Sequence, residues 1–408
     1  MRILLLAQFY PPLIGGIERH VRNLGQALSE RGHQVSVATN WHKGQADVEM
    51  DGAVRVYRVR NTMRRLSFFF SIADQHSPPF PDPEALFALR KIVELEKPEI
   101  VHAHNWIVHS FLPIKKWSGA KLVMSLHDCE LSCVQQRMMF LDEKLCDGPA
   151  LRKCYKCAIH HYGLIKGGVT LTGNWLFSSM ERSLVDMFLP VSKAIAEANR
   201  LVDDDVPYQV VPNFIPDNIT EVGNVSASIA KQLPKENFIL DVGDLLPDKG
   251  VNVLLEAYSG LQGPPPLVLI GQRFSSSPKK FPSNVIVLGS LPHEVVMQVR
   301  KRSLFSVVPS TCLDASPTVT LEAMAMGKPV IGSNIGGIRD QIIDGENGFL
   351  VPPGGVDALR NSMERLISDD QLRMHMGENA RRRARNFFAM EVVTQVEKIY
   401  RSLLYSLS

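Results

Sequence analysis

The sequence lacks long hydrophobic runs and a strong charge of either sign. No segment of the 408-residue chain offers about 18 uninterrupted apolar residues, the length that a membrane-spanning helix needs. The apolar residues 1–7 fit a buried strand and are too short for a signal peptide. A formal net charge of +3 is too small by itself to indicate binding to nucleic acid. We therefore expect a cytoplasmic protein without a nucleic-acid partner.

Cysteine is also scarce, with 6 in the chain, and in a cytoplasmic protein we expect thiols or metal ligands rather than disulfides. Residues 129–161 look like an insertion with little core of its own, and within it only one cysteine pair has the C-x-x-C spacing of a zinc knuckle. Because a metal can supply the missing folding energy, we predict a structural zinc, with a redox-active dithiol as the alternative. The expected ligands are Cys133, Cys146, Cys154 and Cys157.

Strand-length apolar runs alternate with helical patterns in both halves of the chain, which predicts mostly parallel sheets. The expected strands are Ile3–Ala7, Gln34–Thr39, Glu99–His102, Lys121–Ser125, Asp186–Pro190 and Tyr208–Val211, then Phe238–Val242, Leu267–Ile270, Val285–Leu288, Phe305–Val308 and Pro329–Gly332. The expected helices include Ile17–Glu30, Glu84–Glu96, Val251–Tyr258 and Glu294–Lys301.

The length of 408 residues is too great for one ordinary core, and no short internal repeat is present. The polar segment Asp217–Asn237 separates the two alternating series and is the predicted linker. We predict an α/β protein with two doubly wound, Rossmann-like domains facing across a cleft. The first domain covers residues 1–215 and the second residues 216–385, and a terminal helix over 386–408 packs back toward the first domain.

Two carboxylates, Asp314 and Glu322, lie eight positions apart around a predicted helix start. Ser316 is a suitable N-cap, Pro317 suits the first helical position, and Gly327 can end the helix. Asp314 then lies on the loop before the helix, and Glu322 lies within it.

The first turn of this helix, near Thr318 and Val319, is a predicted phosphate site. Unpaired backbone N–H groups and the helix dipole both favour an anion there. A carboxylate beside such a site suits a ribose diol, which needs a strong hydrogen-bond acceptor. The segment therefore indicates a site for a nucleoside diphosphate with a group attached to it.

Three more candidates follow predicted strands, where the ligands of open sheets bind. Gly15 and Gly16 precede a helix without a G-x-G-x-x-G fingerprint, so they form either a phosphate site or an ordinary turn. Lys249 can pair with a pyrophosphate or be an exposed turn lysine. His127 can contact a substrate oxygen, although a lone histidine is usually structural.

Two other histidines, His102 and His104, also end a strand, and we expect them to pack or form hydrogen bonds structurally. The basic run from Arg55 to Arg65 precedes the aromatic residues 68–70. This segment could contact an anionic membrane or a lipid-linked substrate. The alternative is a solvated turn followed by buried aromatic side chains.

Taken together, the motifs resemble the retaining glycosyltransferases of family 4, the group 1 class with the GT-B fold. The likeness covers nearly the whole chain and extends to a subgroup with a cysteine-containing insertion. The segments that carry it are Pro11–Glu18, Val211–Asn213, Lys249–Gly250, Leu321–Val330, Gly336–Asp340 and Asp344–Gly348.

The resemblance implies transfer of a sugar from a UDP- or GDP-linked donor, held mainly by the second domain. The acceptor is then a hydroxyl of a glycan, lipid-linked or polysaccharide molecule, with a role in cell-envelope synthesis at the inner face of the membrane. Attack on the same face as the leaving phosphate needs no enzymatic nucleophile, and no catalytic cofactor is expected. The implied roles are ribose binding by Glu322, sugar contacts by Asp314 and His127, phosphate neutralisation by Lys249, and diphosphate binding by backbone amides near Gly16, Thr318 and Val319.

Two positions depart from the family pattern. Asp314 stands where glutamate is commoner, a loss of one methylene that should still allow hydrogen bonding. Asp244 stands where a diphosphate-binding arginine is common, and Arg273 is a candidate substitute. Two alternatives to an active transferase remain. One is a sugar-nucleotide epimerase, which shares the fold, and the other is a non-catalytic partner subunit, which Asp244 and the cysteine segment suggest.

Overall fold

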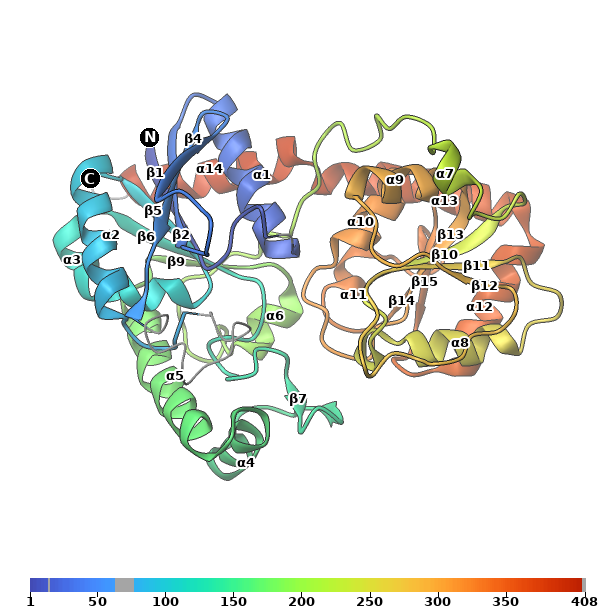
Figure 1. Cartoon of the computed structure of the whole chain (residues 1–408), viewed down its shortest axis with the longest axis horizontal. Coiled ribbons are helices and arrows are strands. Elements are labelled where there is room, and N and C mark those ends of the chain that lie inside the picture. The colour runs from blue at the N-terminus through green and yellow to red at the C-terminus, as the bar shows by residue number, and fades with distance from the viewer. Residues whose placement is uncertain (14, 63–76, 406–408) are drawn as a thin grey trace. The chain divides into compact units, whose positions relative to one another are not determined.

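The computed structural model describes residues 1–13, 15–62 and 77–405. The chain divides into two compact units: Met1–Pro212 with Val393–Ser408, and Asn213–Val392. The sequence had suggested boundaries at 215 and 385. Each unit contains its own sheet with helices around it (Figure 1).

The first unit has a seven-stranded sheet with the strand order β3-β4-β2-β1-β5-β6-β9. All neighbouring strands are parallel except the edge pair β3 and β4. Without the edge strand β3, this order is that of a Rossmann fold, with its reversal between β1 and β5. The strands are β1 (Arg2–Ala7), β2 (Gln34–Asn40), β3 (Val48–Asp51), β4 (Val54–Val59), β5 (Ile100–His104), β6 (Lys121–Leu126) and β9 (Met187–Pro190).

Helices cover this sheet, and the central strand β1 is buried along its whole length after Arg2. The longer helices of the unit are α1 (Gly16–Glu30), α2 (Pro83–Glu96), α4 (Leu151–Tyr162) and α5 (Leu164–Leu184), with the shorter α3 (Lys115–Ser118) and α6 (Lys193–Ala198). Two 3-10 helices, η3 (Trp106–Ser110) and η4 (Leu112–Ile114), follow β5, and a small hairpin of β7 (Met139–Phe140) and β8 (Lys144–Leu145) lies in the cysteine segment.

The second unit has a six-stranded, wholly parallel sheet with the order β12-β11-β10-β13-β14-β15. This is again a Rossmann order, with its reversal between β10 and β13. The strands are β10 (Phe238–Val242), β11 (Leu267–Ile270), β12 (Val285–Val287), β13 (Ser303–Val308), β14 (Val330–Ser333) and β15 (Gly348–Val351). The helices are α7 (Ala227–Ala230), α8 (Val251–Ser259), α9 (His293–Arg302), α10 (Thr318–Ala325), α11 (Ile338–Gln341), α12 (Val356–Ser368) and α13 (Asp370–Ala384), with 3-10 turns η5 (Pro247–Lys249) and η6 (Arg385–Phe387).

Alternate residues of β10 pack into different cores, which shows that both faces of this sheet are covered. Ile239 packs with residues of α8 and α12. Its neighbours Phe238 and Leu240 pack with Val296 and Val299 of α9 on the other face. Two parallel sheets with helices on both sides confirm the predicted pair of Rossmann-like domains.

Some predicted elements were wrong. Tyr208–Val211 is no strand, since only Tyr208 forms a single bridge, to Phe188. The proposed linker at 217–237 belongs to the second unit, because Ile219 and Leu233 are buried in its cores and α7 forms within it. The sequence reading also missed β3, β4 and β15.

The last helix, α14 (Ala389–Tyr405), enters the first unit from Val393 onward. Glu397 accepts a hydrogen bond from Arg31, and its Oε1 atom lies 2.6 Å from Nε2 of His33. Tyr400 is fully buried, with its hydroxyl 2.6 Å from Nδ1 of His102. Among the described residues, no helix is both long and apolar enough to cross a membrane.

Candidate active site

The predicted site residues lie where strands end near the reversals in strand order. In the second unit, Lys249 follows β10 and Asp314 follows β13. In the first unit, Gly15 and Gly16 follow β1, and His127 comes directly after β6. These carboxyl ends are where open α/β sheets bind their ligands.

Lys249 and Asp314 form an ion pair, with 2.9 Å between Nζ and Oδ2. Ser310 donates its hydroxyl to the same Oδ2 atom, also at 2.9 Å. The lysine side chain is 39% exposed and the aspartate 14%, so the pair lies at the surface and is accessible to a ligand. The structure thus joins two residues that the sequence placed 65 positions apart.

Glycine allows the two loops to approach this closely. Gly250 has a φ of 81°, and a Cβ added there would lie 1.9 Å from the carbonyl oxygen of Pro309. The loops are also joined by the backbone, because the Thr311 N–H donates to the Asp248 carbonyl at 2.8 Å. A side chain at position 250 would therefore separate Lys249 from Asp314.

The neighbouring residues Gly336 and Gly337 also contact the backbone of the Asp314 loop. The Gly337 N–H donates to the Asp314 carbonyl oxygen at 2.8 Å. A Cβ at Gly336, where φ is 56°, would lie 2.0 Å from that same oxygen, and one at Gly337 would lie 2.1 Å from the carbonyl oxygen of Ala315. The motif Gly336-Gly337 thus sets the position of the carboxylate loop by close backbone contact.

The helix after Asp314 begins one residue later than expected. Its N-cap is Pro317, and the predicted cap, Ser316, instead receives a hydrogen bond from Gln341 on its hydroxyl at 3.2 Å. Ser316 is wrong as a cap because its carbonyl and hydroxyl are both held by neighbouring side chains, Asn213 being the other donor. Thr318 and Val319 still provide the first-turn N–H groups, and both are half-buried.

The other end of this helix agrees with the sequence. Gly327 has a φ of 69° and follows the C-cap Met326. Its N–H donates to the Met324 carbonyl, and the Lys328 N–H donates to that of Ala323, both at 2.9 Å. This is a Schellman motif, which confirms Gly327 as the helix end.

Glu322 is buried, at 3% exposure, and is held by a histidine and an arginine. Its Oε1 lies 2.8 Å from Nε2 of His293, and its Oε2 accepts from the guanidinium of Arg300 at 3.3 Å. Burial raises the pKa of the neighbouring Asp241 to about 7, while Arg300 and Lys249 act in the opposite direction. The sequence reading missed His293 and Arg300, because no spacing rule links them to a carboxylate on another helix.

In the first unit, Gly15 is the N-cap of α1 and Gly16 its first residue. A Cβ at Gly15 would lie 2.2 Å from the Glu18 carboxylate, which therefore covers the helix start. Burial raises the pKa of Glu18, which favours its neutral form and reduces repulsion of an anion at this end.

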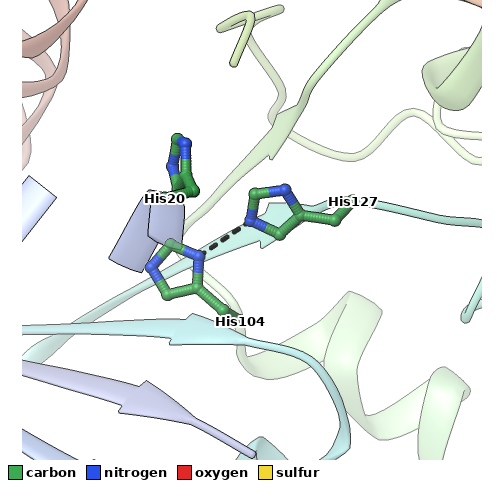
Figure 2. A group of neighbouring side chains, drawn as sticks. All are labelled: His20, His104 and His127. Carbon is green, nitrogen blue, oxygen red and sulfur yellow. Dashed lines mark hydrogen bonds between the residues drawn. The ribbon is translucent and has the colours of Figure 1, made fainter. Parts of the chain in front are cut away.

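His127 lies in a cluster with two other buried imidazoles, His20 of α1 and His104 at the end of β5 (Figure 2). His104 Nδ1 and His127 Nε2 are 2.9 Å apart. The ring of His102 bonds Tyr400 at 2.6 Å and Ser125 at 2.8 Å. His102 and His104 are therefore buried and hydrogen-bonded, as expected.

The four cysteines proposed as zinc ligands form no disulfide bonds. The Cys146 and Cys157 thiols donate to the carbonyls of Gly148 and Met139, and the Cys154 sulfur accepts from the Ala150 N–H. Burial raises the pKa of the Cys133 thiol, although nearby backbone N–H groups oppose this. Across the described part of the chain, the one group of His, Cys, Asp or Glu side chains with metal-ligand atoms within 4.8 Å of one another is His20, His104 and His127.

The described part of the basic run is paired with carboxylates. Arg55 bonds Glu96 at 2.6 Å, Arg60 bonds Asp47 at 2.7 Å, and the buried Arg58 bonds Glu49. The aromatic part of the run, residues 68–70, lies outside the described residues. The arginines seen here therefore present little uncompensated positive charge.

Two other predictions concern the second unit. Asp244 is exposed on the loop after β10. Arg273 is also exposed, and its guanidinium stacks 5.3 Å from the ring centre of Phe281 and bonds the Pro278 carbonyl. The Arg273 side chain is therefore open to solvent. Its role as a substitute for the missing arginine stays a prediction.

Residues 14–218 match the family described as Glycosyltransferase Family 4, and residues 227–383 match Glycosyl transferases group 1. The chain belongs to glycosyltransferase family 4. Among related proteins, glycogen synthase of Mycobacterium tuberculosis is 23% identical, over 98% of this chain and 94% of that protein.

Solved structures agree with this family 4 assignment at the level of the fold. Sucrose-phosphate synthase from Thermosynechococcus elongatus superposes with a TM-score of 0.74 at 20% identity, covering 99% of both chains. HepE of Anabaena in complex with UDP-glucose gives a TM-score of 0.68 at 18% identity, over 98% of this chain and 99% of that one. The predicted family and the GT-B fold are thus confirmed.

Proposed function

We propose that this family 4 glycosyltransferase is a retaining enzyme that moves a sugar from a UDP- or GDP-linked donor to a hydroxyl of a glycan, lipid-linked or polysaccharide acceptor. The observation that carries the proposal is the accessible Lys249–Asp314 pair, 2.9 Å long, at the carboxyl ends of two central strands. The UDP-glucose bound in the HepE structure supports a sugar nucleotide as the donor.

The ion pair suggests how the donor is received. A diphosphate carries more charge than one carboxylate, so on donor binding Lys249 exchanges Asp314 for a phosphate oxygen. Asp314, still held by Ser310, is then an acceptor for a sugar hydroxyl. Lys249 stabilises the charge that develops on the phosphate as the bond between the sugar C1 and the phosphate oxygen breaks.

The remaining groups position the nucleotide and the sugar. Glu322, fixed by His293 and Arg300, accepts hydrogen bonds from the ribose hydroxyls. The N–H groups near Thr318 and Val319 bind the diphosphate, with Gly15 and Gly16 as further backbone donors. His127 contacts the sugar.

The transfer step needs no enzymatic nucleophile. The acceptor oxygen forms its bond to C1 on the face from which the phosphate leaves, and the departing phosphate oxygen takes the acceptor proton. We expect no divalent metal or other catalytic cofactor to be needed, so transfer should persist in EDTA.

A panel of UDP- and GDP-sugars tests the proposal. Calorimetry should show binding of at least one donor, and NMR of the product should show the anomeric configuration of the donor. An inverted product would refute retention. Release of free sugar or its epimer would favour the epimerase alternative, and no binding of any donor would favour a non-catalytic subunit.

We also propose a structural zinc at Cys133, Cys146, Cys154 and Cys157, which requires the cysteine segment to draw the four thiols together. Elemental analysis should find one zinc per chain, and Cys154→Ser with Cys157→Ser should remove it. No zinc, together with reversible formation of a disulfide, would favour the dithiol alternative.

We also propose that the enzyme glycosylates a lipid-linked acceptor at the inner face of the membrane. Flotation with anionic vesicles tests whether the protein binds such a membrane. Co-flotation that is lost at high salt is expected, and absence of co-flotation at low salt would contradict it.

A further inference from the structure

The helix α5 buries its small and polar side chains and exposes its large apolar ones. A helix on the surface of a protein normally does the reverse. The buried residues of α5 are Gly167, Thr170, Gly173, Asn174, Ser178 and Glu181. Its exposed large apolar residues are Leu164, Ile165, Val169, Trp175 and Leu176. The proposed function gives this exposed face no role.

Close contacts fix the rotation of α5 about its axis. A Cβ added at Gly167 would lie 2.6 Å from the carbonyl oxygen of Ala158 on α4, so only glycine allows the two helices to approach this closely. Farther along, Glu181 Oε1 lies 2.8 Å from Nε2 of His109, and both side chains are only 1% exposed. These contacts turn the small and polar face of α5 inward and leave the apolar face in solvent.

The exposed side chains form one continuous stripe. Ile165, Val169, Thr172 and Leu176 follow one another at intervals of three or four positions, which places them on the same face of the helix. The stripe is about 17 Å long at the rise of an α-helix. Trp175 beside it is 76% exposed. Single exposed apolar residues are common, whereas a continuous apolar stripe indicates a binding surface.

The segment that carries this stripe is basic. From Gly148 to Met180 the sequence has four lysine or arginine residues and neither aspartate nor glutamate. Arg152 and Lys156 are exposed one turn apart on α4. In Figure 1, α5 extends outward from the sheet of the first unit, and α4 lies at its outer end. The partner of this surface should therefore be both apolar and anionic.

We propose that α4 and α5 form a docking surface for an anionic lipid membrane. The apolar side chains of α5 enter the boundary between headgroups and acyl chains, while Arg152 and Lys156 contact lipid phosphates. Because α5, like the other described helices, is not long and apolar enough to cross a membrane, it lies along the membrane surface. The proposal rests on the membrane part of the proposed function and assigns the surface responsible for it.

The basic run is the other membrane contact that the sequence suggested. Its described arginines Arg55, Arg58 and Arg60 are paired with carboxylates, whereas the stretch 148–180 contains no carboxylate side chain. The surface of α4 and α5 therefore has the stronger attraction for anionic lipid.

A second copy of the chain is another occupant that an apolar face can have. Two copies that met through α5 would bring their basic residues together, and like charges across an interface oppose association. An anionic bilayer instead offers negative headgroups and an apolar interior side by side. Tryptophan is also enriched where proteins meet that boundary. The observations thus favour a membrane.

Flotation with vesicles of phosphatidylcholine and phosphatidylglycerol tests the apolar stripe. In the combined variant Ile165→Ser, Val169→Ser and Trp175→Ser, we expect the partition coefficient to fall about tenfold or more. Thermal melting should show an intact fold, because all three side chains are exposed. The matched control is Phe87→Ser with Leu95→Ser on α2, where the side chains are 63% and 67% exposed. Its partition coefficient should stay near that of the wild type.

A second pair of variants tests the charge. Arg152→Gln with Lys156→Gln should lower the partition coefficient about 20- to 30-fold, since each basic residue near an anionic surface contributes about fivefold. Lys91→Gln with Lys116→Gln removes the same charge from exposed positions of the same unit. A much smaller loss is expected for this control.

Trp175 reports the contact directly. Its fluorescence should shift to shorter wavelength when vesicles are added, because the indole ring leaves water. Trp175→Phe should lose most of this shift and still float, since the stripe stays apolar. Wild-type fluorescence that does not change on flotation would contradict insertion of α5.

The outcomes are distinct from those of the proposed function. Flotation that is equally strong in the serine variant would overturn the docking surface and leave a membrane-bound acceptor in place. A wild type that does not float would also overturn the surface, while donor binding and transfer to a soluble acceptor still test the transferase. Lack of donor binding would refute the transferase without changing the flotation result. A dimer in sedimentation that the serine variant abolishes would assign the stripe to a second copy instead.

Discussion

The two units share a strand order but differ in the chemistry at the carboxyl ends of their strands. The first unit brings together three buried imidazoles: His20 from α1, His104 at the end of β5 and His127 just after β6. The second unit brings together charged groups: Lys249 with Asp314 on the loops after β10 and β13, and Glu322 of α10 with Arg300 of α9. Imidazoles can form hydrogen bonds with sugar hydroxyls, whereas charged groups suit a diphosphate and a ribose. Under the proposed function, the same strand order would therefore serve two different kinds of recognition.

The largest expected effect concerns Glu322. Glu322→Ala leaves the buried Arg300 without its carboxylate, and breaking such a pair costs about 3–5 kcal/mol of unfolding free energy. Donor binding should be lost as well, because the proposed ribose contact disappears. Urea unfolding and calorimetry with the donor check both. Glu256→Ala, an exposed carboxylate on α8, is the control, and equal effects there would contradict the role.

Lys249→Ala tests the proposed role of Lys249, which is to stabilise the charge on the leaving phosphate. We expect kcat to fall about 100- to 1000-fold, the range for loss of a group that stabilises developing charge. The fold should hardly change, because the pair with Asp314 is partly exposed and such pairs add about 0–1 kcal/mol. Steady-state kinetics and thermal melting separate the two. Lys231→Ala is the matched control, and a kcat near that of the wild type for Lys249→Ala would remove the lysine from the mechanism.

Gly336→Ala tests whether close backbone contact sets the carboxylate loop. The new Cβ meets the Asp314 carbonyl at 2.0 Å, so we expect a loss of about 1–3 kcal/mol and a lower kcat. Gly345→Ala is the matched control, since its φ of 75° is also positive but nothing lies within 4 Å. It measures backbone strain alone. Equal losses of stability and activity in the two variants would show that the contact with the Asp314 carbonyl adds nothing to the effect of backbone strain.

The last prediction concerns the pH dependence of stability that Asp241 causes. Its folded pKa of about 7 lies above the usual value of 3.8, so the folded state binds more protons than the unfolded state between these limits. Stability from this group therefore falls as the pH rises from about 4 to about 7, by at most about 1.4 kcal/mol per pH unit. Asp241→Asn should remove that slope in urea unfolding. An unchanged slope would mean that the charge on Asp241 is balanced by Arg300 and Lys249.

Much of the fold could be predicted because hydrophobic periodicity is local. The runs at Ile3–Ala7 and Leu267–Ile270 are apolar enough to indicate buried strands without any partner. The strands β3 and β4 were missed because polar residues interrupt their hydrophobic runs. In β3, three of the four residues are exposed. The false strand at Tyr208–Val211 had the composition of a strand but finds no full ladder of hydrogen bonds.

The sequence by itself determined the two parallel α/β units, the family, and the residue types at the strand ends. Periodicity and motifs depend on residues that are close together in the sequence, so no tertiary contact is needed to find them. Only the tertiary structure decided which of those residues meet. Three contacts join positions far apart in the chain: the pairing of Lys249 with Asp314, the contacts of Glu322 with His293 and Arg300, and the hydrogen bond between His104 and His127. Their proximity depends on which strands lie side by side and on how closely glycine lets loops approach, and neither is set by local sequence.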